Sequence, residues 1–272
     1  MMQSILGIDA AWTRQQPSGV ALVRGDGMSW TALAAAPSYD AFLAIARGAS
    51  VDWTVRPTGT SPHVGQLVEA ARQIGGCDVR LVALDMPVAK VPFSGRRAAD
   101  NAVSRRFGST GCAAHTPTAD RPGRLGELLT ADLSELGFSL ATTAGEVASG
   151  PCLVEVYPHP ALLSLLRASY RIPYKVSRSN RYWPGRPPQE RRRLLLEKFI
   201  EIHDELSNRI GPLPLDLEAA KESSTLSELK RHEDALDALL CTWIGTTVLS
   251  STAEPLGDES SAVWVPYMLP ES

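Results

Sequence analysis

Residues 4–11 read SILGIDAA, an apolar run that ends on an acidic side chain before two alanines. This pattern is typical of a buried strand whose carboxyl end reaches the surface. Two further strand-like runs follow at 18–23 and 29–33, and Gly-Asp-Gly at 25–27 lies between them. Glycine and aspartate at such a position favour a hairpin turn. The chain is therefore predicted to open with three antiparallel strands.

The rest of the chain alternates between helical and strand-like spacing of its apolar residues. Helical spacing occurs at 39–46, 64–74 and 125–136, strand-like runs occur at 79–85 and 153–157, and a long helix begins near Thr225. This order predicts an α/β fold, with a mixed central sheet of three antiparallel and then parallel strands and with helices on both faces. Because no repeat or clear linker divides the sequence, residues 1–272 are predicted to form a single domain.

Composition excludes several classes of protein. The formal net charge is −3, so a protein that coats nucleic acid non-specifically is excluded and any such contact must come from a local basic patch. The four cysteines are far apart and form no CxxC pair, which favours reduced thiols over disulfides or a structural zinc site. No secretory leader or membrane-spanning apolar run occurs in the sequence. We expect a cytoplasmic protein without a membrane partner.

Acidic residues end or lie within three of the predicted strands and share one face of the last helix. Asp9 and Asp85 end apolar strands, Glu155 lies in a third, and Asp234 and Asp237 are one helical turn apart. A single acid at a strand end is usually a solvated turn residue. Several carboxylates crowd together only if a cation offsets their repulsion, and their oxygens suit Mg²⁺ or Mn²⁺. The crevice at the carboxyl ends of the strands is the usual site in such sheets.

Five short blocks of this sequence resemble an uncharacterised bacterial family described as predicted ribonuclease-H-like nucleases. The blocks are GIDAA at 7–11, ALDMP at 83–87, RAAD at 97–100, VEVYPHP at 154–160 and HEDALDAL at 232–239. They extend over nearly the whole chain. The resemblance implies a ribonuclease-H-like fold and a nuclease that acts on DNA or RNA.

More distantly, the sequence is similar to Holliday-junction resolvases of the same fold. That similarity implies that Asp9 bridges two metal ions, that Asp85 binds one of them, and that Asp234 and Asp237 bind the other. Glu155 is then either a ligand or a residue that orients one. The implied chemistry is hydrolysis with two Mg²⁺ or Mn²⁺ ions roughly 4 Å apart.

Residues 167–198 are strongly basic, with ten Lys or Arg residues against two Glu, and contain four aromatic residues. Basic and aromatic residues together predict a surface for single-stranded or branched nucleic acid, with Arg178 and Arg181 on phosphates and Trp183 on a base. Alternatively, the aromatic residues pack on the core and the arginines are simply solvated. Arg191 to Arg193, on an amphipathic helix, favour this second interpretation.

Two other residues are candidates for substrate binding. Arg97 follows the strand of Asp85 and is predicted to clamp a phosphate, although an ion pair with Asp100 is the alternative. His159, just beyond the strand of Glu155, is the best placed histidine.

Two other functions stay open. The first is a catalytically silent protein of the same fold that binds metal or nucleic acid. The second is a phosphotransferase of the actin-like and sugar-kinase superfamily, which is disfavoured because no glycine-rich phosphate hairpin follows Asp9.

Overall fold

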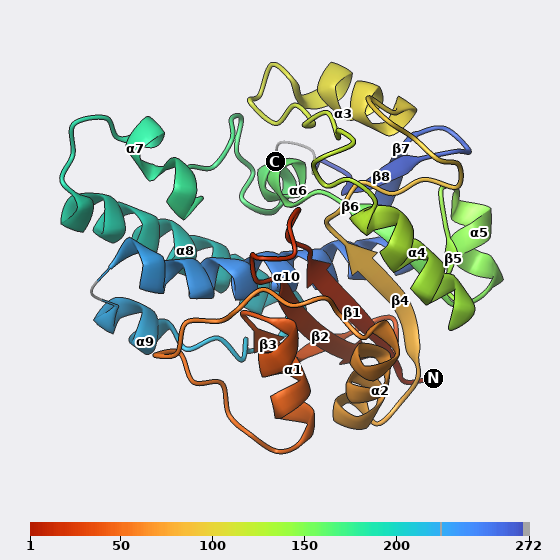
Figure 1. Cartoon of the computed structure of the whole chain (residues 1–272), viewed down its shortest axis with the longest axis horizontal. Helices are drawn as coiled ribbons and strands as arrows, with labels where there is room; N and C mark the ends of the chain where they lie inside the picture. The colour runs from red at the N-terminus through yellow and green to blue at the C-terminus, as the bar shows by residue number, and fades with distance from the viewer. Residues whose placement is uncertain (224, 269–272) are drawn as a thin grey trace.

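The computed structural model describes residues 1–223 and 225–268, and its centre is one mixed β-sheet with helices on both faces (Figure 1). The strand order is β3-β2-β1-β4-β6-β8-β7, and β5 pairs with β6 beside this path. The strands are β1 (Gln3–Asp9), β2 (Gly19–Gly25), β3 (Trp30–Ala36), β4 (Val79–Leu84), β5 (Ser139–Leu140), β6 (Cys152–Val156), β7 (Ala253–Gly257) and β8 (Ala262–Pro266). The predicted α/β class and mixed sheet are confirmed.

The direction of the strands follows the predicted order. β1, β2 and β3 are antiparallel neighbours, whereas β4 runs parallel to β1 and β6 runs parallel to β4. The C-terminal strands were not predicted: β8 is parallel to β6, and β7 pairs with it in an antiparallel hairpin. Pro255 lies within β7 and Pro266 ends β8. Because proline lacks the backbone N–H that a strand needs for pairing, its presence argues against a strand in the sequence.

The two faces of the sheet are covered by different helices. One face packs against α1 (Tyr39–Ala46), α2 (Val64–Gly75) and α4 (Leu125–Glu135), and the other against α6 (Pro158–Leu165), α8 (Pro188–Ile210) and α10 (Leu226–Leu249). The remaining helices are α3 (Ala98–Phe107), α5 (Ala144–Ser149), η1 (Val176–Arg178), α7 (Ser179–Tyr182) and α9 (Leu217–Glu222). Among the helices in the described ranges, none is long and apolar enough to cross a bilayer.

The helix α10 is fixed at its start and along its length. Thr225 and Glu228 form the predicted capping box at its first turn. Glycines let it approach the sheet closely: a Cβ atom on Gly7 would lie 2.4 Å from the carbonyl oxygen of Ala238, and one on Gly19 would lie 1.9 Å from that of Asp234. The backbone of α10 therefore lies directly against β1 and β2, which places the acids of its first half beside the end of β1.

Replacing Gly19 with Ala is expected to destabilise the protein by about 1–3 kcal/mol, because the new methyl group forces α10 away from the sheet. Gly65 on α2 is the matched control, since a Cβ atom there meets nothing within 4 Å. Gly65→Ala should stabilise the helix by roughly 0.5–1 kcal/mol. Urea unfolding measures both changes, and equal effects of the two substitutions would contradict the close packing described above.

Candidate functional site

Asp9 and Asp85 lie side by side at the carboxyl ends of two central parallel strands. Ile8 pairs with Leu84, and the backbone N–H of Asp85 donates to the carbonyl oxygen of Ile8 at 2.9 Å. Strand alternation then directs both aspartates to the face that α10 covers. Both are half-buried and line a cleft of about 880 Å³. Within the described ranges, neither carboxylate has a hydrogen-bond or ion-pair partner.

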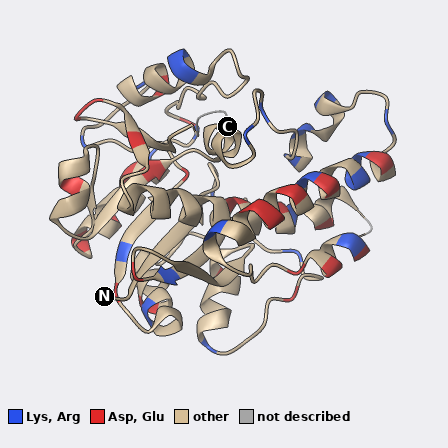
Figure 2. Cartoon of the chain, turned by 180° about the vertical axis from the view of Figure 1, so that it is seen from behind, with Lys and Arg blue, Asp and Glu red and all other residues tan. Residues whose placement is uncertain are grey.

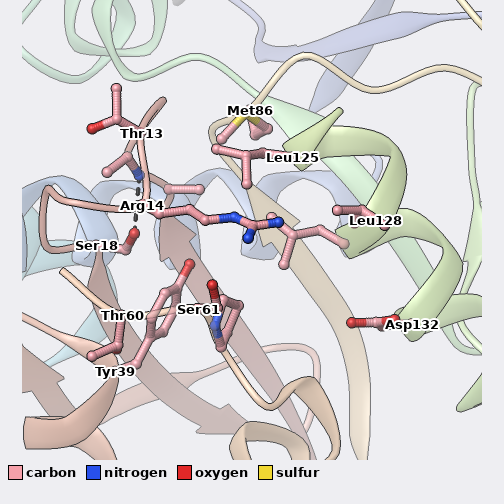
Figure 3. A pocket seen from close by; sticks show the side chains of 14 residues that line it. Thr13, Arg14, Ser18, Tyr39, Thr60, Ser61, Met86, Leu125, Leu128 and Asp132 are labelled. Atoms are coloured by element: carbon pink, nitrogen blue, oxygen red, sulfur yellow. Dashed lines mark hydrogen bonds between the residues drawn. The ribbon is translucent and has the colours of Figure 1, made fainter. Parts of the chain in front are cut away.

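The loop after Asp9 separates this cleft from a smaller pocket of about 160 Å³, and Ala10 and Ala11 line both. The loop is held in place by Ser18, whose hydroxyl accepts a hydrogen bond from the N–H of Ala11 at 3.0 Å. Figure 3 shows the side chain of Arg14 lying across the smaller pocket, between Tyr39 and Leu125.

The acids of α10 differ in their access to the cleft. Asp234 and its neighbour Glu233 line the cleft, whereas Asp237 is completely buried. Both oxygens of Asp237 are engaged: the Tyr174 hydroxyl donates to Oδ1 at 2.7 Å, and the Lys175 ammonium donates to Oδ2. Asp237 therefore anchors two residues that come from the loop before η1.

Two lysines compensate the charge of these acids. The Lys175 Nζ atom lies 3.7 Å from Oε1 of Glu233 in addition to its contact with Asp237. Lys230 lies one helical turn before Asp234 on α10. Its Nζ atom is 3.1 Å from the same Glu233 oxygen and also contacts Asp234. Both lysines line the cleft. The site thus combines carboxylates and ammonium groups on one wall.

Burial is the largest cause of the shifts in the pKa values of these acids. Loss of solvent raises the pKa of Asp9 and raises that of Asp85 well above its ordinary value, and the negative charge of Asp9 adds to the shift of Asp85. Burial also raises the pKa of Asp237 to about 7, against the opposing effect of Lys175. Acids with such shifted pKa values are typical of functional sites.

Replacing Asp85 with Asn should stabilise the metal-free protein, increasingly so as the pH rises. The raised pKa means that the folded parent keeps its proton after the unfolded chain has lost it, so the parent loses stability over that pH range at up to about 1.4 kcal/mol per pH unit. The asparagine side chain carries no charge at any pH, so the Asp85→Asn protein does not lose this stability as the pH rises. Urea unfolding of both proteins with EDTA, from pH 5 to pH 8, measures the difference. A constant difference over that range would contradict the burial of an ionisable Asp85.

The carboxylate cluster for two metal ions stays a prediction. The described part of the chain brings no three Asp, Glu, His or Cys side chains into an arrangement that holds a metal ion as it stands. The physical reason is visible at Asp237 and Asp234, whose oxygens contact Lys175 and Lys230. Oxygen ligands of the type that hard cations prefer are nevertheless present at Asp9 and Asp85.

Glu155 lies on the opposite face of the sheet from Asp85. It pairs in register with Leu84, and its two oxygens accept hydrogen bonds from Arg97 at 2.5 and 2.7 Å. Arg97 also forms an ion pair with Asp100 at 2.7 Å, and all three side chains are buried. The structure therefore corrects two expectations: Glu155 is not part of the acidic site, and Arg97 is not free to clamp a substrate phosphate.

The basic stretch at 167–198 divides into two parts. Arg171, Lys175 and Arg178 line the cleft, as does the buried His159. Beyond them, Arg181 is exposed on α7. Trp183 is half-buried and packs against the core, as the alternative interpretation expects, and its stacking on a base stays a prediction.

Farther along, basic and acidic residues alternate on the surface of α8 (Figure 2), with pairs such as Arg193 and Glu197. On α8 the arginines lie on the surface beside acidic partners, as the second interpretation expects, whereas a nucleic-acid surface at the cleft stays a prediction.

Comparison with known proteins adds a family but no characterised relative. A family model described as a protein of unknown function (DUF429) matches residues 7–261. No curated protein and no solved structure matches the chain.

Proposed function

The chain belongs to the DUF429 family of unknown function, and we propose that it is a divalent-metal-dependent nuclease whose site is the acidic cleft. One observation carries the proposal. Asp9 and Asp85 present adjacent carboxylates without hydrogen-bond or ion-pair partners in the described ranges, at the ends of parallel strands and in the wall of a large cleft. A divalent cation bound between two adjacent carboxylates would offset the repulsion between their negative charges.

The arrangement of the sheet supports a ribonuclease-H-like fold for this protein. Three antiparallel strands are followed by the parallel β4 and β6. Resolvases of that fold place an acid in the first strand, another at the end of the fourth, and an acidic pair in the last helix. Here Asp9 ends β1, Asp85 follows β4, and Asp234 and Asp237 lie in α10. The acids of this chain therefore take the same positions along the strands and the last helix as the acids of those resolvases.

In the proposed site, Asp9 and Asp85 hold a Mg²⁺ or Mn²⁺ ion. Such an ion lowers the pKa of an attacking water and offsets the charge of a phosphodiester. Asp237 and Glu233 hold the ammonium group of Lys175 in the cleft wall, so Lys175 supplies a second fixed positive charge beside the acids. We propose this lysine in place of the second metal ion that the sequence similarity implied, because the acids of α10 are already engaged.

The proposed substrate is a nucleic acid, DNA or RNA. Arginines from separate segments line the cleft, including Arg56, Arg121, Arg171 and Arg178. They form a local basic surface in a protein whose net charge is −3, as a polyanionic substrate requires.

A second candidate is a protein that binds nucleic acid in this cleft without cleaving it. The contacts of Lys175 and Lys230 favour it, because two ammonium groups already compensate part of the acidic charge.

One experiment separates the two candidates. Purified protein is incubated with single-stranded, duplex and branched DNA and RNA in Mg²⁺, in Mn²⁺ or in EDTA, and the products are resolved on denaturing gels alongside a binding assay. Metal-dependent cleavage supports the nuclease, whereas binding without cleavage supports the second candidate. A protein that neither binds nor cleaves any of these substrates contradicts both.

A further inference from the structure

The cleft contains a second group of side chains, on the wall formed by the segments around 115, 159 and 171–178. In this group each of two arginines contacts a histidine instead of a carboxylate. The Arg178 Nη2 atom lies 3.0 Å from Nε2 of His115, and Arg171 contacts Nε2 of His159 in the same way. The backbone N–H of Arg171 also donates to the carbonyl oxygen of Thr110 at 2.9 Å, which joins the segment that leads to His115 to the segment 171–178.

The chemistry of these contacts fixes the state of both histidines. A guanidinium group has no lone pair to offer and can only donate, so Nε2 of each imidazole must accept. An imidazole that accepts at Nε2 is neutral and carries its proton on Nδ1. Burial and the nearby arginine charges lower the pKa of His159 well below its ordinary value, and they lower that of His115 too. Both pairs therefore keep the full positive charge of their arginine.

Buried donors in this group lack partners. The Nδ1 atom of His159 and the Nε atom of Arg171 are both inaccessible and have no hydrogen-bond partner in the described part of the chain. His159 is 6 % exposed, so its polar atoms depend on the protein or on a ligand. A buried donor without an acceptor costs free energy. Side-chain contacts to Arg171 or Arg178 from a carboxylate are also absent among the described residues.

Neutral partners and unpaired buried donors in one cleft wall together point to a ligand. Some arginines in the described part of the chain pair with carboxylates, as Arg97 does with Glu155, and others donate to backbone carbonyl oxygens, as Arg24 does to Gly75. Arg171 donates to the carbonyl oxygen of Gly111 as well as contacting His159, so neither of its partners cancels its charge. A carboxylate would orient the guanidinium and cancel its charge, whereas an imidazole orients it and leaves the charge available. Two guanidinium groups in one cleft wall, neither paired with a carboxylate in the described part of the chain, supply the charge and the N–H donors that a phosphate group binds.

We propose that Arg171 and Arg178 form an anion subsite that binds a phosphate group of the substrate other than the one hydrolysed, with His159 and His115 as positioning residues. The subsite rests on the proposed function only in its choice of a nucleic-acid substrate. It lies in the same cleft as Asp9 and Asp85, so a chain bound at the acids continues over it. Its ligand is either a terminal phosphate or an internal phosphate of the strand.

The test measures binding in EDTA, where no hydrolysis occurs. Fluorescence anisotropy follows three single-stranded oligonucleotides of one sequence, with a 5′-phosphate, with a 3′-phosphate and with hydroxyl groups at both ends. Arg171→Met and Arg178→Met should each weaken binding about 10- to 100-fold, as expected for the loss of charge-assisted hydrogen bonds. Arg193→Met on α8, whose partner is Glu197, is the matched control and should bind like the parent.

Substitutions at the exposed His115 test the role of a neutral partner. His115→Gln keeps a neutral acceptor for Arg178 and should preserve affinity, whereas His115→Glu keeps the contact but cancels the charge and should weaken binding as much as Arg178→Met does. A purely structural role for this contact would make the two substitutions equivalent. That result would overturn the proposal.

The affinities of the three oligonucleotides also identify the kind of phosphate that is bound. Tighter binding of one phosphate-ended oligonucleotide that disappears in Arg178→Met identifies a terminal phosphate, and equal losses for all three identify an internal one. Equal affinities of folded Arg178→Met and Arg193→Met, or no binding of any oligonucleotide by the parent, overturn the subsite. Binding that depends on these arginines without any cleavage in Mg²⁺ would keep the subsite and remove the nuclease.

Discussion

Replacing Asp9 with Asn is expected to lower the rate of metal-dependent phosphodiester cleavage by on the order of a thousandfold. Asn keeps the shape of the side chain but removes the negative charge that, in the proposed site, would hold the metal ion beside Asp85. Loss of the ion removes several kcal/mol of transition-state stabilisation. The rate is measured on the substrate cleaved best by the parent, at several Mg²⁺ concentrations.

The control for this prediction is Asp204→Asn, because the Asp204 side chain is 67 % exposed on α8. It should leave the rate unchanged. Equal rates for the parent and Asp9→Asn, with the control also active, would show that cleavage takes place elsewhere or comes from a contaminant.

Replacing Arg97 with Met is expected to destabilise the protein by about 3–5 kcal/mol. Glu155 and Asp100 are buried, and without Arg97 their charges have no compensation. Burial already raises the pKa of Glu155, so Glu155 takes up a proton as the pH falls and the loss should be smaller at pH 5 than at pH 8.

Urea unfolding at both pH values measures the effect of Arg97→Met. The control is Arg124→Met, because Arg124 pairs with Glu127 on the surface and is 80 % exposed, so the change should lie within about 0.5 kcal/mol. If Arg97→Met kept full stability and lost substrate binding instead, Arg97 would return to the phosphate-clamping role that the sequence suggested.

The first half of the sheet could be predicted from the sequence, because β1, β4 and β6 are apolar runs with clear ends. The capping box at Thr225 likewise marked the start of α10. The same patterns placed Asp9 and Asp85 at strand ends. The hairpin of β7 and β8 was missed because its prolines interrupt the strand pattern.

The charge balance of the site could not be predicted in the same way. Lys230 was detectable, because it lies four residues before Asp234 on one helix face. The contact of Lys175 with Asp237 joins residues 62 positions apart, and no local pattern reveals it. The contact of Arg97 with Glu155 spans 58 positions, whereas its ion pair with Asp100 follows helical spacing and was foreseen as the alternative. Local spacing finds local pairs, and only the fold reveals the others.

The central claim is that Asp9 and Asp85 bind a divalent metal ion. It is tested most directly by calorimetric titration of Mn²⁺ into the metal-free parent, Asp9→Asn and Asp204→Asn at pH 7.5. We predict saturable binding of a single ion by the parent and by Asp204→Asn, and no binding by Asp9→Asn. Identical Mn²⁺ binding by all three proteins, or the absence of binding by the parent, would contradict the claim.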